Sequence, residues 1–155
     1  MTTQKTSLTI IDGYSFVFRA YYSLPPLTNK EGIPVGALYG FANMLYKVWQ
    51  DSKTDLFAVV FDAGKTTFRN EIYPKYKANR PEAPTDLKIQ FPLIREVTEA
   101  MNIPTLEQVG VEADDIIATL VASHPHKDIT IYSGDKDLMQ LVNEPAISDI
   151  KYISG

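Results

Sequence analysis

The sequence predicts a three-layer α/β domain built on a mostly parallel sheet. Short, continuous apolar runs rich in β-branched residues recur along the chain, and each is typical of a strand buried on both faces. Segments with apolar residues at helical spacing alternate with these runs, and this alternation produces a parallel sheet covered by helices. The length of 155 residues, of which 45% are hydrophobic, suits one domain with a substantial core.

The first three predicted strands each lead to an aspartate close to the strand's C-terminal end. These pairs are 8–11 with Asp12, 56–61 with Asp62, and 129–132 with Asp135. Ligands bind at this edge of parallel α/β sheets, because the loops there converge on a crevice. An aspartate at the start of such a loop also serves as a helix cap. Capping explains any one of these residues but not the convergence of all three.

The remaining predicted elements fill the intervals. Apolar side chains recur at helical spacing in residues 35–50 and 91–101, and a further helix is expected from about residue 136 to 142. Residues 150–153 form one more predicted strand. Neither an internal repeat nor an interdomain linker interrupts this order, so we expect a single domain.

Three carboxylates lie within four residues at the start of an apolar segment that extends from residue 109 to 123: Glu112, Asp114 and Asp115. The apolar residues that follow lie four apart in two neighbouring rows, which predicts a helix buried against the sheet. One carboxylate would satisfy a helix cap, which is the alternative interpretation. Three anions held together repel one another unless a cation joins them, and Mg²⁺ or Mn²⁺ prefers such oxygen ligands.

Residues 64–80 differ from the core in composition. They contain five basic residues, one acidic residue and three interspersed aromatic residues, directly after the strand that ends near Asp62. This combination is typical of a loop that contacts phosphates and stacks on bases, although a solvated charged loop has a similar composition.

Composition excludes several classes of protein. The chain has no cysteine, which excludes disulfides, zinc–cysteine sites and thiol nucleophiles. Its net charge of −4 argues, as an average, against nucleic-acid binding, but the local distribution of charge can outweigh the average. No stretch is apolar enough to span a bilayer, and the N-terminus lacks a signal-peptide pattern, so a cytoplasmic location without membrane contact is expected.

Five stretches in a characteristic order carry a family resemblance: IIDGYSFVFRAYYSLPP, VGALYGF, AVVFDAGKTTFRNEIYPKYKANRP, GVEADDIIATL and SGDKDLMQLV. Together they resemble the 5′–3′ exonuclease domain at the N-terminus of bacterial DNA polymerase I, a member of the flap endonuclease superfamily with a PIN-like (resolvase-like) fold. The resemblance covers nearly the whole chain from Leu8 onward. The joint pattern is far more specific than IIDG or GD-x-D alone.

The resemblance implies a metal-dependent nuclease that acts on DNA in replication and repair. The family's metal-binding acidic residues correspond here to Asp12, Asp62, Glu112, Asp114, Asp115, Asp135 and Asp137. Two divalent ions, Mg²⁺ or Mn²⁺, are implied in the complete enzyme, where metal-activated water attacks the phosphodiester in line. This set is the one suggested by the strand ends and the helix start, with Asp137 added.

The resemblance also implies DNA with a 5′ single-stranded flap or end as the partner. Residues around 64–90 correspond to the family's arch or clamp, through which the single strand passes. The expected DNA-contacting residues are Arg19, Arg69, Tyr76, Lys77 and Arg80. Among them, Lys77 and Arg80 match the phosphate-contacting pair that takes part in catalysis, and Tyr76 matches a stacking aromatic residue.

Residues 1–155 correspond to the N-terminal, metal-binding portion of such a domain. The family continues into a GD-x-SDN motif, a helix-hairpin-helix-like element and, in polymerases, a polymerase domain, and none of these lies in this sequence. We therefore expect a complete first metal site, a weakened second site and poor affinity for duplex DNA in this chain.

Three alternatives belong to other classes. A haloacid dehalogenase or receiver-type protein also carries strand-end aspartates, but the Gly13-Tyr14 that follows Asp12 does not fit either pattern. A PIN-type ribonuclease shares the carboxylates without needing the basic segment. A non-catalytic DNA-binding module would bind DNA without metal and cut nothing.

Overall fold

The computed structural model describes residues 7–62, 84–123, 128–134 and 147–151, the last of these as backbone only. Within these residues a five-stranded sheet has the order β3-β2-β1-β4-β5, and every pair of neighbouring strands is parallel. The strands are β1 Ser7–Asp12, β2 Leu56–Val60, β3 Thr105–Leu106, β4 Asp128–Tyr132 and β5 Ile147–Lys151.

The central strand β1 pairs with β2 on one side and β4 on the other, so that Ile10 lies opposite both Ala58 and Ile131. The chain first builds the sheet from β1 through β2 to β3, and then returns to the other side of β1 for β4 and β5. The strand order therefore reverses at β1, and the crevice outside the carboxyl ends of strands at such a point is where ligands bind in open α/β sheets.

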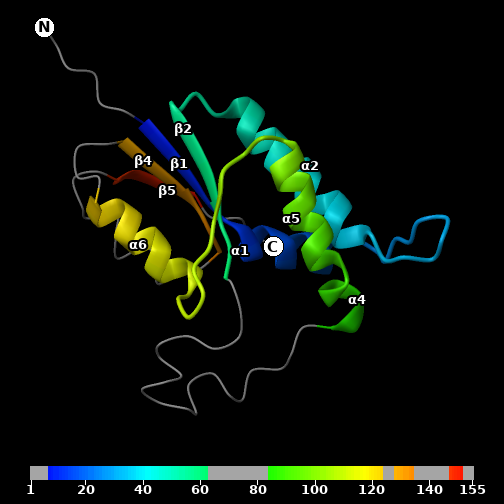
Figure 1. Ribbon diagram of the computed structural model, residues 1–155. Helices are drawn as coiled ribbons and strands as arrows, with labels where there is room; N and C mark the ends of the chain where they lie inside the picture. The colour runs from blue at the N-terminus through cyan, green and yellow to red at the C-terminus, as the bar shows by residue number, and fades with distance from the viewer. Residues whose placement is uncertain (1–6, 63–83, 124–127, 135–146, 152–155) are drawn as a thin grey trace, which may run out of the picture.

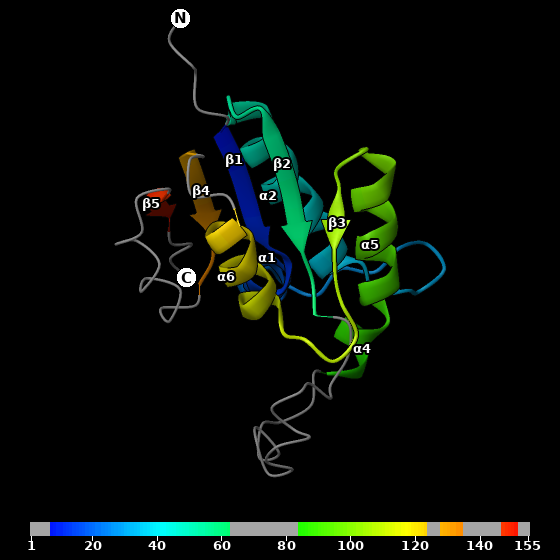
Figure 2. The ribbon, with the colours of Figure 1, turned by 60° about the vertical axis from the view of Figure 1, so that its left-hand side comes forward.

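Helices cover both faces of the sheet, so that helices, sheet and helices form the three predicted layers (Figure 1). The helices are α1 Gly13–Ser23, α2 Gly36–Asp51, α4 Thr85–Lys88, α5 Gln90–Ala100 and α6 Ala113–Ser123. Among the described helices, the ribbons place α6 on one face and α2 with α5 on the other (Figures 1 and 2).

The alternation of side chains along β1 explains the two layers of core. Ile11 is fully buried against α1, α2 and α5, in a cluster that includes Phe16 and Phe41. Its neighbour Ile10 points to the opposite face and packs in a second cluster with Ile117 of α6. Because successive strand side chains point to opposite faces, a continuous apolar run such as 8–11 can fill both clusters.

The observed elements confirm the three-layer parallel prediction, with corrections in detail. The predicted helices 35–50 and 91–101 correspond to α2 and α5, each within one residue at both ends. The strand expected at 150–153 begins earlier, at Ile147, and residues 152–155 are outside the described part. The helix expected at 136–142 also lies outside it. The sequence analysis did not anticipate α1, α4 or β3.

Candidate metal centre

Asp12 stands at the last position of β1, directly before α1. Its Oδ2 atom accepts hydrogen bonds from the hydroxyls of Ser15 and Ser133, each at 2.8 Å. Ser133 is fully buried just after β4, whereas Ser15 lies in the first turn of α1. Two hydroxyls from different elements therefore fix the orientation of this carboxylate at the carboxyl edge of β1 and β4.

The glycine after Asp12 lets the chain turn from strand to helix in a crowded place. A Cβ atom on Gly13 would lie 2.5 Å from the ring of Phe61 and 3.0 Å from the carbonyl oxygen of Val60. Both distances are shorter than normal contacts, so a side chain here would displace either the ring of Phe61 or the strand. The close approach keeps Asp12 next to the end of β2.

Asp62 follows β2 by two residues and contacts the start of α6. Its Oδ1 atom accepts a hydrogen bond of 2.6 Å from the main-chain N–H of Ala113, the first residue of that helix. The start of α6 is therefore capped by a carboxylate that lies just after β2. Within the same first turn, the Asp114 carboxylate accepts a bond of 3.0 Å from the N–H of its neighbour Asp115.

The three acidic residues at the start of α6 lie close together. One carboxylate oxygen each from Glu112, Asp114 and Asp115 lies within 4.8 Å of the other two, and Glu112 is only 8% exposed. Oxygens that ligate one Mg²⁺ at about 2.0–2.1 Å are at most about 4.2 Å apart. Small side-chain rotations would bring these three atoms into that range.

Electrostatics connect this cluster to the strand ends. Burial is the largest influence on Asp62 and raises its pKa above the ordinary value, and the negative charges of Asp12, Glu112 and Asp114 raise the pKa further. The hydrogen bond from Ala113 acts in the opposite direction. Four carboxylates thus repel one another in a half-buried region. A divalent cation bound by hard oxygen ligands would relieve that repulsion, and the residues present fit such an ion.

A comparison with protein families identifies the chain. The family model of the 5′–3′ exonuclease N-terminal resolvase-like domain matches residues 7–154. The chain belongs to this family.

Sequence relatives of this exonuclease domain come from diverse bacteria. DNA polymerase I of Rhizobium leguminosarum is 51% identical over 146 residues, which cover 88% of this chain and 14% of the relative. The 5′-3′ exonuclease of Aquifex aeolicus is 46% identical over 140 residues, which cover 89% of this chain and 48% of the relative. The chain therefore spans less than half the length of these relatives.

Solved structures share the exonuclease-domain fold. The T5 D15 protein co-crystallised with metal ions gives a TM-score of 0.69 at 24% identity, over 92% of this chain and 54% of that one. The same bacteriophage protein, described as a flap endonuclease in complex with DNA and metal ions, gives a TM-score of 0.63 at 23% identity. At these identities the likeness supports the PIN-like fold.

The structure describes six of the predicted site residues in this exonuclease domain. It places Asp12 and Asp62 beside the cluster of Glu112, Asp114 and Asp115. Arg19 is further away, because it lies seven residues along α1 from Asp12, about 10 Å of helix. Its Nη1 atom is buried and has no hydrogen-bond partner among the described residues. The other predicted residues lie outside those described: Arg69, Tyr76, Lys77, Arg80, Asp135 and Asp137.

Sequence reasoning missed three residues that contact the site. Ser15 and Ser133 lie close in sequence to Asp12 and Asp135, and a hydroxyl within a few residues of each predicted ligand was an available signal. Arg95 donates from its Nη2 atom to the main-chain carbonyl of Asp62 at 2.9 Å. Nothing in the pattern of α5 marks Arg95 as different from a solvated helix residue.

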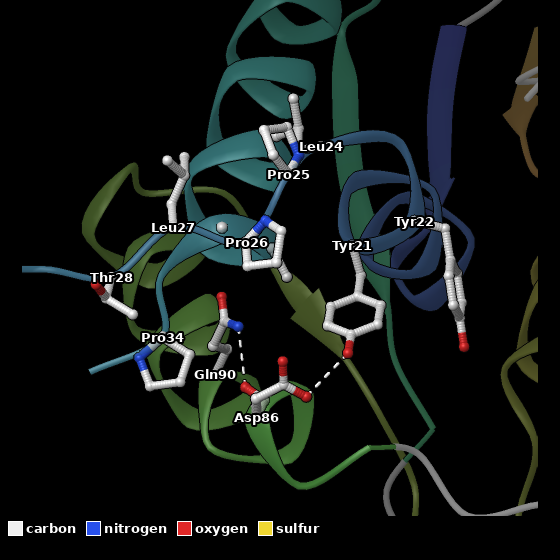
Figure 3. A pocket seen from close by; sticks show the side chains of 12 residues that line it. Tyr21, Tyr22, Leu24, Pro25, Pro26, Leu27, Thr28, Pro34, Asp86 and Gln90 are labelled. Carbon is white, nitrogen blue, oxygen red and sulfur yellow. Dashed lines mark hydrogen bonds between the residues drawn. The ribbon is translucent and has the colours of Figure 1, made fainter. Parts of the chain in front are cut away.

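The acidic cluster does not lie in the pocket shown in Figure 3, which has a volume of about 450 Å³. That pocket lies beside the loop between α1 and α2, with Tyr21 and Pro26 in its lining. In its wall, the Tyr21 hydroxyl donates to Asp86 at 2.9 Å, and the Gln90 amide donates to the Asp86 carbonyl at 2.9 Å. None of the candidate metal ligands that the structure describes lines it.

None of the helices in the described part of the chain is both long enough and apolar enough to cross a membrane.

Proposed function

We propose that this chain is the metal-binding portion of a divalent-metal-dependent 5′–3′ exonuclease and 5′-flap endonuclease that hydrolyses phosphodiester bonds of DNA. One observation carries the proposal. Asp12, Asp62, Glu112 and Asp114 come from three separate segments, and the charges of the other three act on Asp62 at the edge of the sheet where the strand order reverses. Metal-dependent hydrolysis of phosphodiesters uses carboxylates gathered in this way.

The donor set favours Mg²⁺ or Mn²⁺, since both are hard ions that prefer carboxylate oxygens and the described candidates include no sulfur or imidazole. Two such ions are expected in the complete enzyme. When bound, they supply a water of lowered pKa and stabilise charge on the attacking and leaving oxygens. Asp135 and Asp137 are proposed as further ligands, although they lie outside the described residues.

The chain's own residues prepare the site for this role. The hydroxyls of Ser15 and Ser133 donate hydrogen bonds to the Asp12 carboxylate. The main-chain amide of Ala113 donates one to the Asp62 carboxylate. These bonds fix the carboxylates before an ion arrives, so less conformational freedom is lost on binding. Burial of Glu112 and Asp62 reduces the local dielectric and strengthens their attraction for a cation.

DNA is the proposed substrate because the chain belongs to the 5′–3′ exonuclease family and because residues 64–80 are rich in basic side chains. A bacteriophage relative of the fold has been solved with DNA and metal ions. Lys77 and Arg80 are proposed to contact phosphates, Tyr76 to stack on a base, and Arg69 and Arg19 to contact the backbone.

Linkage to a polymerase in the full-length protein is proposed from relatives such as the DNA polymerase I of Rhizobium leguminosarum, which extends far beyond the matched region. A cytoplasmic location is proposed with it. The portion described here is expected to bind its first metal ion and to cleave DNA poorly on its own, because the residues that grip the duplex are expected in the remainder.

The test is cleavage of an end-labelled 5′-flap DNA by the full-length protein and by this chain, in Mg²⁺, in Mn²⁺ and in EDTA. Glu112→Gln removes a candidate ligand without changing the side chain's size, and Glu99→Gln on the exposed surface of α5 is the matched control. We expect metal-dependent cutting that Glu112→Gln abolishes and Glu99→Gln retains. Equal binding of DNA by wild type and Glu112→Gln in EDTA, together with no cutting by either protein in Mg²⁺ or Mn²⁺, would instead indicate a non-catalytic DNA-binding module.

A further inference from the structure

Arg95 of α5 connects four segments that meet behind the proposed metal centre. Its Nη2 atom lies 2.9 Å from the main-chain carbonyl oxygen of Asp62 and 3.3 Å from the hydroxyl of Tyr14. It also forms an ion pair of 2.9 Å with Glu107, which follows β3. One guanidinium therefore joins α5 to the ends of β2 and β3 and to the first turn of α1.

These contacts continue the pairing of β2 with β3 beyond the end of the sheet. The N–H of Phe61 donates to the carbonyl of Leu106 at 2.9 Å. One residue further along both segments, the guanidinium of Arg95 bridges the carbonyl of Asp62 and the carboxylate of Glu107. A side chain thus takes the place of a further pair of strand hydrogen bonds, at the point where β2 delivers its carboxylate.

Aromatic packing fixes the guanidinium in this place. Its central carbon lies 5.5 Å from the ring centre of Phe61, a distance at which cations are attracted to the face of a ring. The ring of Tyr14 packs edge-on against Phe61, with the ring centres 5.6 Å apart. The planar, rigid fork of arginine suits a site with several acceptors and a ring, whereas lysine offers a single flexible donor point.

The arrangement contributes more to position than to stability. The side chains of Arg95 and Glu107 are 32% and 41% exposed, and ion pairs at such exposure contribute little to folding. Arg95 contacts the main-chain carbonyl of Asp62 and forms its ion pair with Glu107. The guanidinium therefore does not occupy the Asp62 carboxylate, which can bind a metal ion. Asp62 is then held at two points, its carbonyl by Arg95 and its Oδ1 atom by the amide of Ala113.

We propose that Arg95 is a positioning residue of the metal centre, which fixes the chain at Asp62 so that the Asp62 carboxylate faces Glu112 and Asp114. This inference rests on the proposed metal-dependent function. Without Arg95, the main chain beyond the last strand hydrogen bond is free to rotate, and the carboxylate leaves both the Ala113 amide and the acidic cluster.

The test compares Arg95→Met, which keeps an unbranched side chain to pack on Phe61 but removes every donor, with Arg95→Lys, which restores one cationic donor. Lys47→Ala, on the exposed surface of α2, is the control for loss of a positive charge. The first readout is the NMR signal and hydrogen exchange of the Ala113 amide in metal-free protein, relative to amides deeper in α6. The second readout is the affinity for Mn²⁺ alone, measured by calorimetry.

We expect Arg95→Met to accelerate exchange of the Ala113 amide selectively and to weaken Mn²⁺ binding about tenfold, the usual size for loss of an outer contact to a ligand. Arg95→Lys should recover part of both, and Lys47→Ala should match wild type. If Arg95→Met does not fold, Arg95→Gln gives the same two readouts.

Unchanged exchange at Ala113, or unchanged Mn²⁺ affinity while the wild type binds the ion, would overturn the positioning role. Uniformly faster exchange throughout α6 would also overturn it, because it indicates a purely structural contribution. Failure of the wild type to bind Mn²⁺ would overturn the proposed function itself, and this outcome is distinct because the Ala113 amide reports on Arg95 without any metal.

Discussion

The carboxylate of Asp62 accepts a hydrogen bond from the amide of Ala113, 51 residues later in the chain. This bond joins the carboxyl end of β2 to the start of α6, across the edge of the sheet. It caps the helix, and it also places Asp62 beside the acidic residues that flank Ala113 in sequence. One contact therefore serves both the helix and the proposed metal site, and it keeps a carboxylate partly buried among other negative charges.

This arrangement predicts an unusual dependence of stability on pH in the absence of metal. Burial and the neighbouring acids raise the folded-state pKa of Asp62 above its ordinary value of 3.8. In the window above that value the folded state holds a proton that the unfolded chain releases, so this residue's contribution to stability is present at lower pH and is lost as the pH rises. Asp62→Asn removes the titration and keeps an oxygen that can accept from Ala113.

Melting temperatures of wild type and Asp62→Asn in EDTA, measured from pH 3.5 to 7, check this prediction. We expect the wild type to lose stability relative to the variant as the pH rises. Asp55→Asn is a control of opposite sign, because hydrogen bonds from the Ser7 amide and hydroxyl lower the pKa of Asp55. The stability that Asp55 contributes is fully present above its ordinary pKa of 3.8 and is lost only as the pH falls below it, so the wild type should show no decline relative to Asp55→Asn between about pH 4 and 7. The same trend for both variants would contradict the prediction.

Added metal should restore the stability that the metal-free protein loses at higher pH. An ion that binds only the folded state stabilises it by about 2.7 kcal/mol at one hundred times its dissociation constant. We therefore expect Mn²⁺ to raise the melting temperature of the wild type and to do so much less in Glu112→Gln, which lacks one of the clustered oxygens. Thermal scans with and without Mn²⁺ measure the difference.

Glu99→Gln should respond to Mn²⁺ like the wild type, because Glu99 is exposed on α5. An equal rise in melting temperature for Glu112→Gln and Glu99→Gln would mean that the ion binds elsewhere.

The convergence of Asp12 and Asp62 was predictable from sequence because both follow runs that fill two faces of a parallel sheet, and such strands end at one edge. Helix α1 was not anticipated: its buried residues Phe16, Val17 and Ala20 lie at helical spacing, but exposed aromatic residues such as Phe18 and Tyr22 interrupt its polar face and obscure the pattern. Strand β3 has only two residues, Thr105 and Leu106, which is too short for a periodic signal. Tertiary pairing with β2 creates it.

The same reasoning explains which parts of the site escaped sequence analysis. A carboxylate at a strand end is visible because position and chemistry coincide in one residue. Arg95 acts through the carbonyl of Asp62, 33 residues away, and its role depends on the packing of α5 against the sheet. No local pattern encodes such a contact. Ser133 is an intermediate case, because it is near a predicted ligand in sequence yet acts on Asp12, which is 121 residues away.

Ser133→Ala should weaken both folding and metal binding. The change removes a buried hydroxyl that donates to the charged Asp12 carboxylate at 2.8 Å. Hydrogen bonds to charged groups contribute about 1.5–3 kcal/mol, and we expect a loss of that size in urea unfolding. Mn²⁺ affinity should fall about tenfold, since Asp12 loses one of its orienting contacts.

The matched control is Ser123→Ala at the end of α6, where the hydroxyl donates to the Thr119 carbonyl on the exposed surface. That change should alter the free energy of unfolding by less than about 0.5 kcal/mol and leave Mn²⁺ affinity unchanged. Equal effects of the two substitutions would show that the hydroxyl of Ser133 has no special relation to the metal centre.

Gly13→Ala tests the close approach that brings the two strand ends together. The added methyl group would lie 2.5 Å from the ring of Phe61 and 3.0 Å from the Val60 carbonyl, so either the ring or the strand must move. Overpacking of this kind costs about 1–3 kcal/mol. A Cβ atom at Gly134, by contrast, meets only Ser15 among the described residues, at 3.8 Å, an ordinary contact. Urea unfolding should therefore show a much larger loss of stability for Gly13→Ala than for Gly134→Ala.

The Mn²⁺ affinity of Gly13→Ala should fall together with its stability, because the displaced ring of Phe61 also packs on Arg95 and directly precedes Asp62. A Gly13→Ala protein with wild-type stability would mean that the ring moves freely and that β1 and β2 need no glycine to place Asp12.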